Sequence, residues 1–187
     1  MPIIKGFFFD LDDTLVGTKE ANFHAYKEAL ADAGITFSYD DFLRTWGEDS
    51  RKFIPRLAPH LSVDEIEAIR TNKAEKYQQH LDKTTPNQSL ITFLAAMAPH
   101  HTMVLVTTAK RKNAESLLRA YNLTDYFDYL VLGDDVKKGK PDPEAYIKAL
   151  AISGLVANEV VVFEDSEAGI AAAQAAGLNV VQIRNFA

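Results

Sequence analysis

The apolar residues of this chain gather in five short segments that are continuous rather than alternating with polar positions. These segments cover residues 3–9, 101–108, 129–132, 159–165 and 179–184. A short apolar run that ends in a polar turn is typical of a β-strand. Because the runs do not alternate, both faces of each strand must be covered, which predicts a parallel sheet.

Helical patterns separate the later strands. Apolar residues recur on one stripe of residues 112–121, and residues 143–150 open with a proline that suits a first helical turn, with Asp142 before it as a cap. Residues 168–176 are rich in alanine and end before Gly177, a good left-handed stop. Strand and helix therefore alternate, which predicts an α/β fold with a doubly wound, Rossmann-like core.

The segment that follows the first strand has helical patterns but no strong strand pattern. These patterns cover residues 19–33, 41–46 and 51–57, with a longer one from residue 62 onward. The last helix opens on Ser62, with Glu65 three residues on to complete a capping box. The sequence thus predicts a sheet domain made of residues 1–16 and 85–187, and an inserted all-helical domain made of residues 17–84.

Composition and charge narrow the possible functions. The 187 residues carry a net charge of −6, and the longest basic cluster is residues 110–112, so we expect no nucleic-acid partner. The absence of cysteine excludes disulfides and thiolate catalysis. The apolar runs are too short to cross a membrane, and the first residues lack the basic region and cleavage site of a signal peptide. We therefore expect a cytoplasmic protein without a membrane partner.

Polar residues follow the predicted strands at the ends where open α/β sheets bind ligands. They are Asp10, Asp12, Asp13, Thr107, Thr108, Glu164 and Asp165. Lys140 lies in the loop after the third strand, and Pro141 restricts its backbone to an extended form. Together these residues form the candidate site.

Carboxylates that converge from several strands are stable only with a compensating cation. Oxygen ligands without a nearby histidine or cysteine favour Mg²⁺ over zinc, and Mg²⁺ commonly joins one or two carboxylates to a substrate phosphate. Taken singly, Asp12 and Asp13 could be turn residues and Asp165 a helix cap. Their combination at the strand ends favours a metal site.

A threonine hydroxyl and a lysine ammonium near the same sheet edge could both bind a phosphoryl group. Thr107 could instead reflect strand propensity alone, and Lys140 could be a solvated loop lysine. The solvated description fits Lys137 and Lys138, in the same loop, better than Lys140.

Four segments together resemble the four motifs of the haloacid dehalogenase superfamily in order and spacing. They are "FFFDLDDTL", "VLVTTAK", "KKGKPDPEAY" and "VVVFEDSEAGIAAAQAAG". The resemblance covers nearly the whole chain. It is closest to the phosphatase and phosphomutase branch, in which an all-helical cap is inserted after the first motif.

The resemblance implies catalytic roles for four residues. Asp10 would be the nucleophile that forms an aspartyl-phosphate, and Asp12 the general acid and base. Thr107 would hold the transferring phosphoryl group, and Lys140 would offset the charge of the transition state. Asp12 also argues against a halogenated substrate, because the dehalogenases of this superfamily lack an aspartate two residues after the nucleophile.

The resemblance also implies a magnesium site. Asp165, with Glu164 assisting, would hold Mg²⁺ together with the Asp10 carboxylate and the backbone carbonyl of Asp12. The metal would neutralise the repulsion between an anionic carboxylate and an anionic phosphate. Asp13 would only shape the turn.

The helical insert resembles a cap that closes over the site and selects the substrate. Asn22 and Arg51 in the insert, and Thr108 in the core, are predicted to contact substrate. Arg51 could equally be a solvated surface arginine. Related hexose-phosphate mutases usually have a histidine where this chain has Asn22, which makes the mutase function less favoured.

The predicted function is that of a Mg²⁺-dependent phosphatase acting on a small phosphorylated metabolite, such as a sugar phosphate, phosphoglycolate or a nucleotide-like compound. The alternatives are a phosphosugar mutase of the β-phosphoglucomutase type and a non-catalytic regulator of the same fold. Both a monomer and a homodimer are compatible with the sequence.

Overall fold

A computed structural model describes residues 3–184 of the chain, which divide into two compact units. One unit contains the described residues up to Gly17 and from Thr85 onward, and the other runs from Thr18 to Thr84. The sequence places Gly17 in the helical segment, whereas the structure places it in the first unit. The reason is a short antiparallel pair, β2 (Val16–Gly17) with β3 (Thr85–Pro86), in which Gly17 pairs with Thr85.

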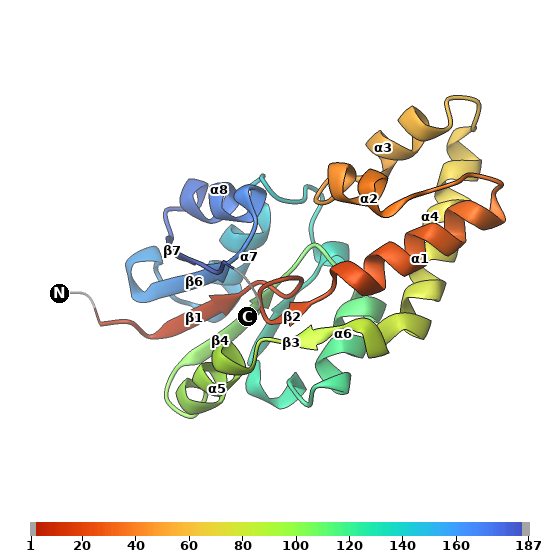
Figure 1. Cartoon of the computed structure of the whole chain (residues 1–187). Helices are drawn as coiled ribbons and strands as arrows, with labels where there is room; N and C mark the ends of the chain where they lie inside the picture. The colour runs from red at the N-terminus through yellow and green to blue at the C-terminus, as the bar shows by residue number, and fades with distance from the viewer. Residues whose placement is uncertain (1–2, 185–187) are drawn as a thin grey trace. The chain divides into compact units, whose positions relative to one another are not determined.

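The first unit is built on a parallel five-stranded sheet with the order β5-β4-β1-β6-β7. Figure 1 shows its central strand β1 between β4 and β6. Its strands are β1 (Gly6–Phe9), β4 (Thr102–Val106), β5 (Tyr129–Val131), β6 (Val160–Glu164) and β7 (Asn179–Gln182). The five strands and their parallel pairing confirm the predicted doubly wound α/β fold. The strand order reverses beside β1, and in such sheets this point marks the ligand-binding crevice.

The central strand β1 is covered on both faces, as its apolar run predicted. Phe8 belongs to a buried cluster that also contains Val104 and Val162 of the neighbouring strands. Next to it along β1, Phe9 stacks on Phe163 with ring centroids 4.9 Å apart. Successive side chains of a strand point to opposite faces, so β1 contributes apolar surface to two layers. This fixes the position of the residue that follows the strand, Asp10.

We expect Phe8→Ala to lower the free energy of unfolding of the protein by about 3–5 kcal/mol, because it opens a cavity in a closely packed core. Phe8 is fully buried, whereas Ile147 on the helix surface is 53% exposed. The matched change Ile147→Ala should cost less than about 1 kcal/mol. Urea denaturation followed by circular dichroism measures both, and equal losses would show that Phe8 is not part of the core.

Four α-helices accompany the sheet in the described part of the first unit. They are α5 (Gln88–Met97), α6 (Arg111–Ala120), α7 (Glu144–Ser153) and α8 (Glu167–Ala175). The last three match the predicted helices within a few residues, and Gly177 has the expected positive φ of 79°. α5 is not among the predicted helices, although four of its apolar residues recur at helical spacing: Leu90, Phe93, Leu94 and Met97. Its Phe93 packs against Phe7 and Phe163 of the sheet.

The second unit is helical, as predicted. It contains α1 (Lys19–Asp32), α2 (Tyr39–Thr45), α3 (Ser50–Leu57), α4 (Val63–Tyr77) and the 3₁₀ segment η1 (Gln78–Lys83). α1 packs against α4, and the core of the unit includes Phe37, Phe42 and Phe53. The predicted capping box of Ser62 and Glu65 is present at the start of α4. Within residues 3–184, none of the helices is both long and apolar enough to cross a membrane.

Candidate active site

Three carboxylates meet at the carboxyl ends of two neighbouring strands. Asp10 follows β1 directly, Glu164 is the last residue of β6, and Asp165 comes next. β1 and β6 pair in parallel, so the ends of both strands lie at the same sheet edge. One oxygen from each carboxylate lies within 4.8 Å of the others. The convergence expected from the strand ends is therefore present in the structure.

Lys140 reaches into this carboxylate cluster from its loop. Its Nζ donates to Asp10 Oδ1 at 2.7 Å, to Glu164 Oε1 at 2.5 Å and to the carbonyl oxygen of Val106 at 3.0 Å. The lysine side chain is only 5% exposed. Lys140 is thus buried and paired and is not a solvated loop residue. Lys138 in the same loop is 72% exposed, as the sequence suggested.

Burial controls the electrostatics of the pair formed by Asp10 and Lys140. Burial raises the pKa of Asp10 well above its usual range; Lys140 opposes this shift, and Glu164 adds to it. For Lys140, burial alone would lower the pKa, but the facing groups, led by Asp10, outweigh it and hold the pKa above its usual value. The ammonium therefore stays charged. One lysine faces two buried carboxylates, which leaves excess negative charge.

Asp165 adds to this excess. Burial, then Glu164 and Asp13, raise the pKa of Asp165 to about 6, although a hydrogen bond from Thr14 Oγ1 at 3.2 Å acts in the opposite direction. A nearby cation would favour the ionised form. The cluster offers oxygen ligands only, which is the donor set of Mg²⁺. The residues therefore fit the predicted metal.

The turn after Asp10 contains the other two aspartates of the motif. Asp13 is buried and has a φ of 58°, in the left-handed region that aspartate tolerates in turns. Its backbone N–H donates to the carbonyl of Val16 at 2.7 Å, which closes the turn. The backbone of Asp12 forms an isolated β-bridge with that of Val16, and Asp12 is half-buried. The conformation of Asp13 is consistent with the turn role expected of it. The acid–base role of Asp12 stays a prediction.

Thr107 follows β4 and is almost completely buried. Its hydroxyl accepts a hydrogen bond from the backbone N–H of Ala109 at 3.0 Å, and its own N–H donates to Val131 at 3.0 Å. The backbone after Thr107 passes close to Gly133: a Cβ on Gly133 would lie 2.2 Å from the carbonyl oxygen of Thr108. The Thr107 hydroxyl is held in one place, while Thr108 is exposed.

The two remaining substrate-contact candidates lie in the helical unit. Asn22 is buried; its Nδ2 donates to the carbonyl of Thr18 at 3.1 Å, and its Oδ1 accepts from Lys73 Nζ at 2.6 Å. Both ends of the carboxamide are thus engaged. Whether Asn22 touches substrate stays a prediction.

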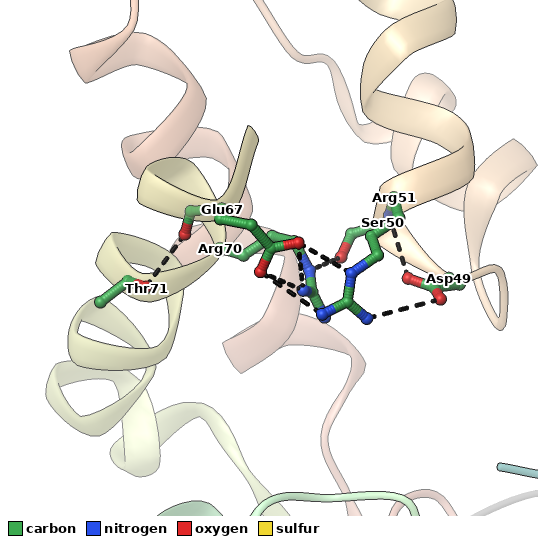
Figure 2. A network of polar contacts seen from close by, with 6 residues as sticks. All are labelled: Asp49, Ser50, Arg51, Glu67, Arg70 and Thr71. Carbon is green, nitrogen blue, oxygen red and sulfur yellow. Dashed lines mark hydrogen bonds and ion pairs between the residues drawn. The ribbon is translucent and has the colours of Figure 1, made fainter. Parts of the chain in front are cut away.

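Arg51 takes part in a network of charged side chains at the start of α3 (Figure 2). Its guanidinium donates twice to Glu67, from Nε at 2.7 Å and Nη2 at 3.4 Å, and lies 3.9 Å from Asp49. Arg70 binds the same Glu67 carboxylate and donates to Ser50 Oγ at 2.8 Å. Arg51 is exposed but ion-paired, so it would have to exchange partners to bind a ligand.

Three further residues contact the charged residues of the site and are not among the predicted site residues: Tyr146, Ser166 and Gly169. The ring centroid of Tyr146 lies 5.2 Å from Lys140 Nζ, and Ser166 donates to Glu164 from both its backbone and its hydroxyl. Gly169 sits directly beside the Glu164 carboxylate. Tyr146 and Gly169 lie inside two of the quoted motifs, but nothing in the residue pattern alone shows what they contact.

The fold and the site define an α/β protein with a buried aspartate–lysine pair and a carboxylate cluster suited to a divalent cation. The family described as Haloacid dehalogenase-like hydrolase matches residues 7–183. The chain belongs to this family, which confirms the resemblance seen in the four motifs.

Known relatives cover the chain almost completely. It is 31% identical over 94% of its length to a phosphorylated carbohydrates phosphatase of Thermotoga maritima, of which the match covers 82%. It is 27% identical to the fructose-1-phosphate phosphatase YqaB of Escherichia coli, with 96% of each chain covered. The crystal structure of CbbY from Rhodobacter sphaeroides in complex with phosphate matches with a TM-score of 0.87 at 25% identity, over 98% of this chain and 88% of CbbY.

Proposed function

We propose that this protein is a Mg²⁺-dependent phosphatase that hydrolyses a small phosphorylated metabolite, in particular a sugar phosphate, through an aspartyl-phosphate. The chain is a phosphoric monoester hydrolase of its family. The observation that carries the proposal is the buried Asp10 carboxylate, which lies 2.7 Å from Lys140 Nζ and within 4.8 Å of oxygens of Glu164 and Asp165. The names of the relatives support the sugar phosphate class.

In the first step, a carboxylate oxygen of Asp10 attacks phosphorus, and the bond between phosphorus and the ester oxygen breaks. Asp12 gives its proton to the departing oxygen, so an alcohol leaves. The Thr107 hydroxyl donates to a phosphoryl oxygen, and the Lys140 ammonium, which stays bonded to Asp10, offsets the negative charge that develops beside it. Asp12 then takes a proton from water, which attacks the acyl phosphate, releases inorganic phosphate and regenerates Asp10.

Asp10, Asp165, Glu164 and the backbone carbonyl of Asp12 would hold the metal. When bound, Mg²⁺ supplies positive charge that lets an anionic carboxylate approach an anionic phosphate. The excess negative charge around Lys140 is the feature of this chain that calls for such a cation. Glu164 also binds Lys140 and Ser166, so it contributes to both halves of the site.

The identity of residue 22 favours water, rather than a second sugar hydroxyl, as the phosphoryl acceptor. The carboxamide of Asn22 does not titrate, and both of its polar atoms are already bonded. Related hexose-phosphate mutases usually have a histidine, which can titrate, at this position. The chain also has every carboxylate and lysine that the chemistry uses, which argues against a non-catalytic role.

The test is a phosphate-release screen over sugar phosphates, phosphoglycolate and nucleoside monophosphates, with Mg²⁺ and with EDTA. We expect release from at least one sugar phosphate, lost in EDTA and restored by added Mg²⁺. ³¹P NMR of glucose 1-phosphate separates the mutase alternative, which would give glucose 6-phosphate with little free phosphate. Metal-independent release, or interconversion without release, would contradict the proposal.

Arg51 is proposed as a residue that recognises the substrate beyond its phosphoryl group. Arg51→Ala should raise KM for the preferred sugar phosphate by about tenfold to a hundredfold, the value of a charge-assisted hydrogen bond. Hydrolysis of p-nitrophenyl phosphate, which has no sugar hydroxyls, should hardly change. Arg44→Ala is the control, because Arg44 is an exposed arginine of the same unit that pairs with Asp41. If both variants have the wild-type KM, Arg51 is only a surface ion pair.

A further inference from the structure

The Glu164 carboxylate is fully buried, and both of its oxygens have partners. Oε1 accepts from Lys140 Nζ at 2.5 Å. Oε2 accepts from the backbone N–H of Ser166 at 2.8 Å and from its hydroxyl at 3.0 Å. Ser166 is also the N-cap of α8, where its Oγ accepts from Gly169 N at 3.1 Å. Glu164 is therefore anchored on one side to the start of α8 and on the other to the catalytic lysine.

Gly169 lies in direct contact with this carboxylate. A Cβ at residue 169 would lie 1.6 Å from Glu164 Oε1 and 2.0 Å from its Cδ, where no real atom fits. The glycine lies within α8, and its φ is not among the positive values of the described residues, so the backbone conformation does not require glycine there. Alanine forms helices better than glycine. The missing side chain is explained by the space that Glu164 occupies.

Lys140 depends on this arrangement because each of its ammonium N–H groups has an acceptor. The three acceptors are Asp10 Oδ1, the carbonyl of Val106 and Glu164 Oε1, and the ring of Tyr146 covers a further side. If Glu164 moves, one N–H group loses its partner in a buried place, and the ammonium no longer has a single position.

We propose that Gly169 is a positioning residue: by lacking a side chain it seats the Glu164 carboxylate, and Glu164 in turn fixes the Lys140 ammonium against Asp10. This makes α8, through one glycine, responsible for the geometry of a lysine that lies 29 residues earlier in the chain. Only the kinetic readout of this inference rests on the proposed function. The contact of Gly169 with Glu164, called the Gly169 seat below, and the bond of Glu164 to Lys140 need neither metal nor substrate.

The kinetic test is the variant Gly169→Ala. We expect kcat to fall by about a hundredfold with little change in KM, as a misplacement on the scale of 1 Å does. Gly139→Ala is the matched control: it makes the same change next to Lys140, but its new Cβ would meet only Thr108 Cγ2, at an ordinary 3.7 Å. This control should keep the wild-type kcat.

A double-mutant cycle separates the Gly169 seat from a general effect on folding. Glu164→Asp draws the carboxylate back by one methylene and leaves room for a Cβ at residue 169. In that background, adding Gly169→Ala should lower kcat by less than about threefold further, because the two residues act through one contact. Equal losses in both backgrounds would overturn the proposal.

A second readout uses the metal-free protein and needs no activity. The ¹H–¹⁵N signal of the Lys140 ammonium, assigned by its loss in Lys140→Ala, should be observable because its N–H groups are buried and bonded. Gly169→Ala should shift or broaden this signal, whereas Gly139→Ala should not. In the Glu164→Asp background, Gly169→Ala should leave it as in Glu164→Asp alone. If Gly169→Ala folds with an unchanged ammonium signal, the proposal is wrong, even if phosphatase activity is confirmed. If no phosphate is released by the wild type, only the proposed function fails.

Discussion

Asp10→Asn is expected to lower kcat for phosphate release by roughly 10⁴-fold or more, as deletion of a nucleophile does. The amide oxygen is too weak a nucleophile to attack phosphorus, so no aspartyl-phosphate can form. The fold should survive, because asparagine has the same shape and Lys140 keeps Glu164 as a charged partner. Steady-state phosphate release with Mg²⁺, and circular dichroism of the same sample, measure the two effects.

Asp13→Asn is the matched control for this experiment. It makes the same chemical change three residues later, at a turn position with a φ of 58° that asparagine also tolerates. Its activity should stay within a few-fold of wild type, on the scale of changes outside the reacting groups. Activity near wild type in Asp10→Asn would remove Asp10 from the role of nucleophile.

Lys140→Ala is expected to impair both catalysis and stability. Removing the cation beside the developing charge should lower kcat by about 10²–10³-fold. The same change leaves the buried carboxylates of Asp10 and Glu164 without their cation, which should lower the free energy of unfolding by about 3–5 kcal/mol in the absence of metal. The variant should therefore be both slower and less stable than wild type.

Lys138→Ala shows whether these losses are specific. Lys138 lies in the same loop, but its side chain is exposed and pairs with Asp142 at 3.4 Å. Its removal should change the free energy of unfolding by less than about 0.5 kcal/mol. Urea denaturation in EDTA and kcat in Mg²⁺ are measured for both lysine variants. If the two variants have the same stability and the same kcat, Lys140 has no role beyond that of an ordinary loop lysine.

The sequence predicted the core of the fold because β1 and its neighbours carry a strong local signal. Three consecutive phenylalanines before Asp10 can only be buried, and burial on both faces follows from the lack of alternation. The helix α5 is missing from the sequence prediction although its residues carry a helical period. Four apolar residues recur at helical spacing, and one of them, Phe93, packs against Phe7 of the sheet: Leu90, Phe93, Leu94 and Met97.

The candidate site could be predicted as a set of strand-end residues but not as a set of contacts. Parallel strands bring their carboxyl ends together, so Asp10 and Asp165 were expected at one place. Lys140 bonds to Asp10, which lies 130 residues before it in the chain, and to Glu164, which lies 24 residues after it. Both hydrogen bonds depend on how loops and helices pack. The Gly169 seat depends on the same packing, and no residue pattern reveals it.

Asp10 is proposed to carry the phosphoryl group, and chemical trapping of the aspartyl-phosphate tests this role at the residue itself. The enzyme would be mixed with its preferred substrate and Mg²⁺, quenched in acid during turnover and reduced with borohydride, which converts an aspartyl-phosphate to homoserine. Mass spectrometry of the peptide that contains residue 10 then reads the result. We predict homoserine at position 10 in wild type and none in Asp10→Asn; homoserine at another aspartate would contradict the account.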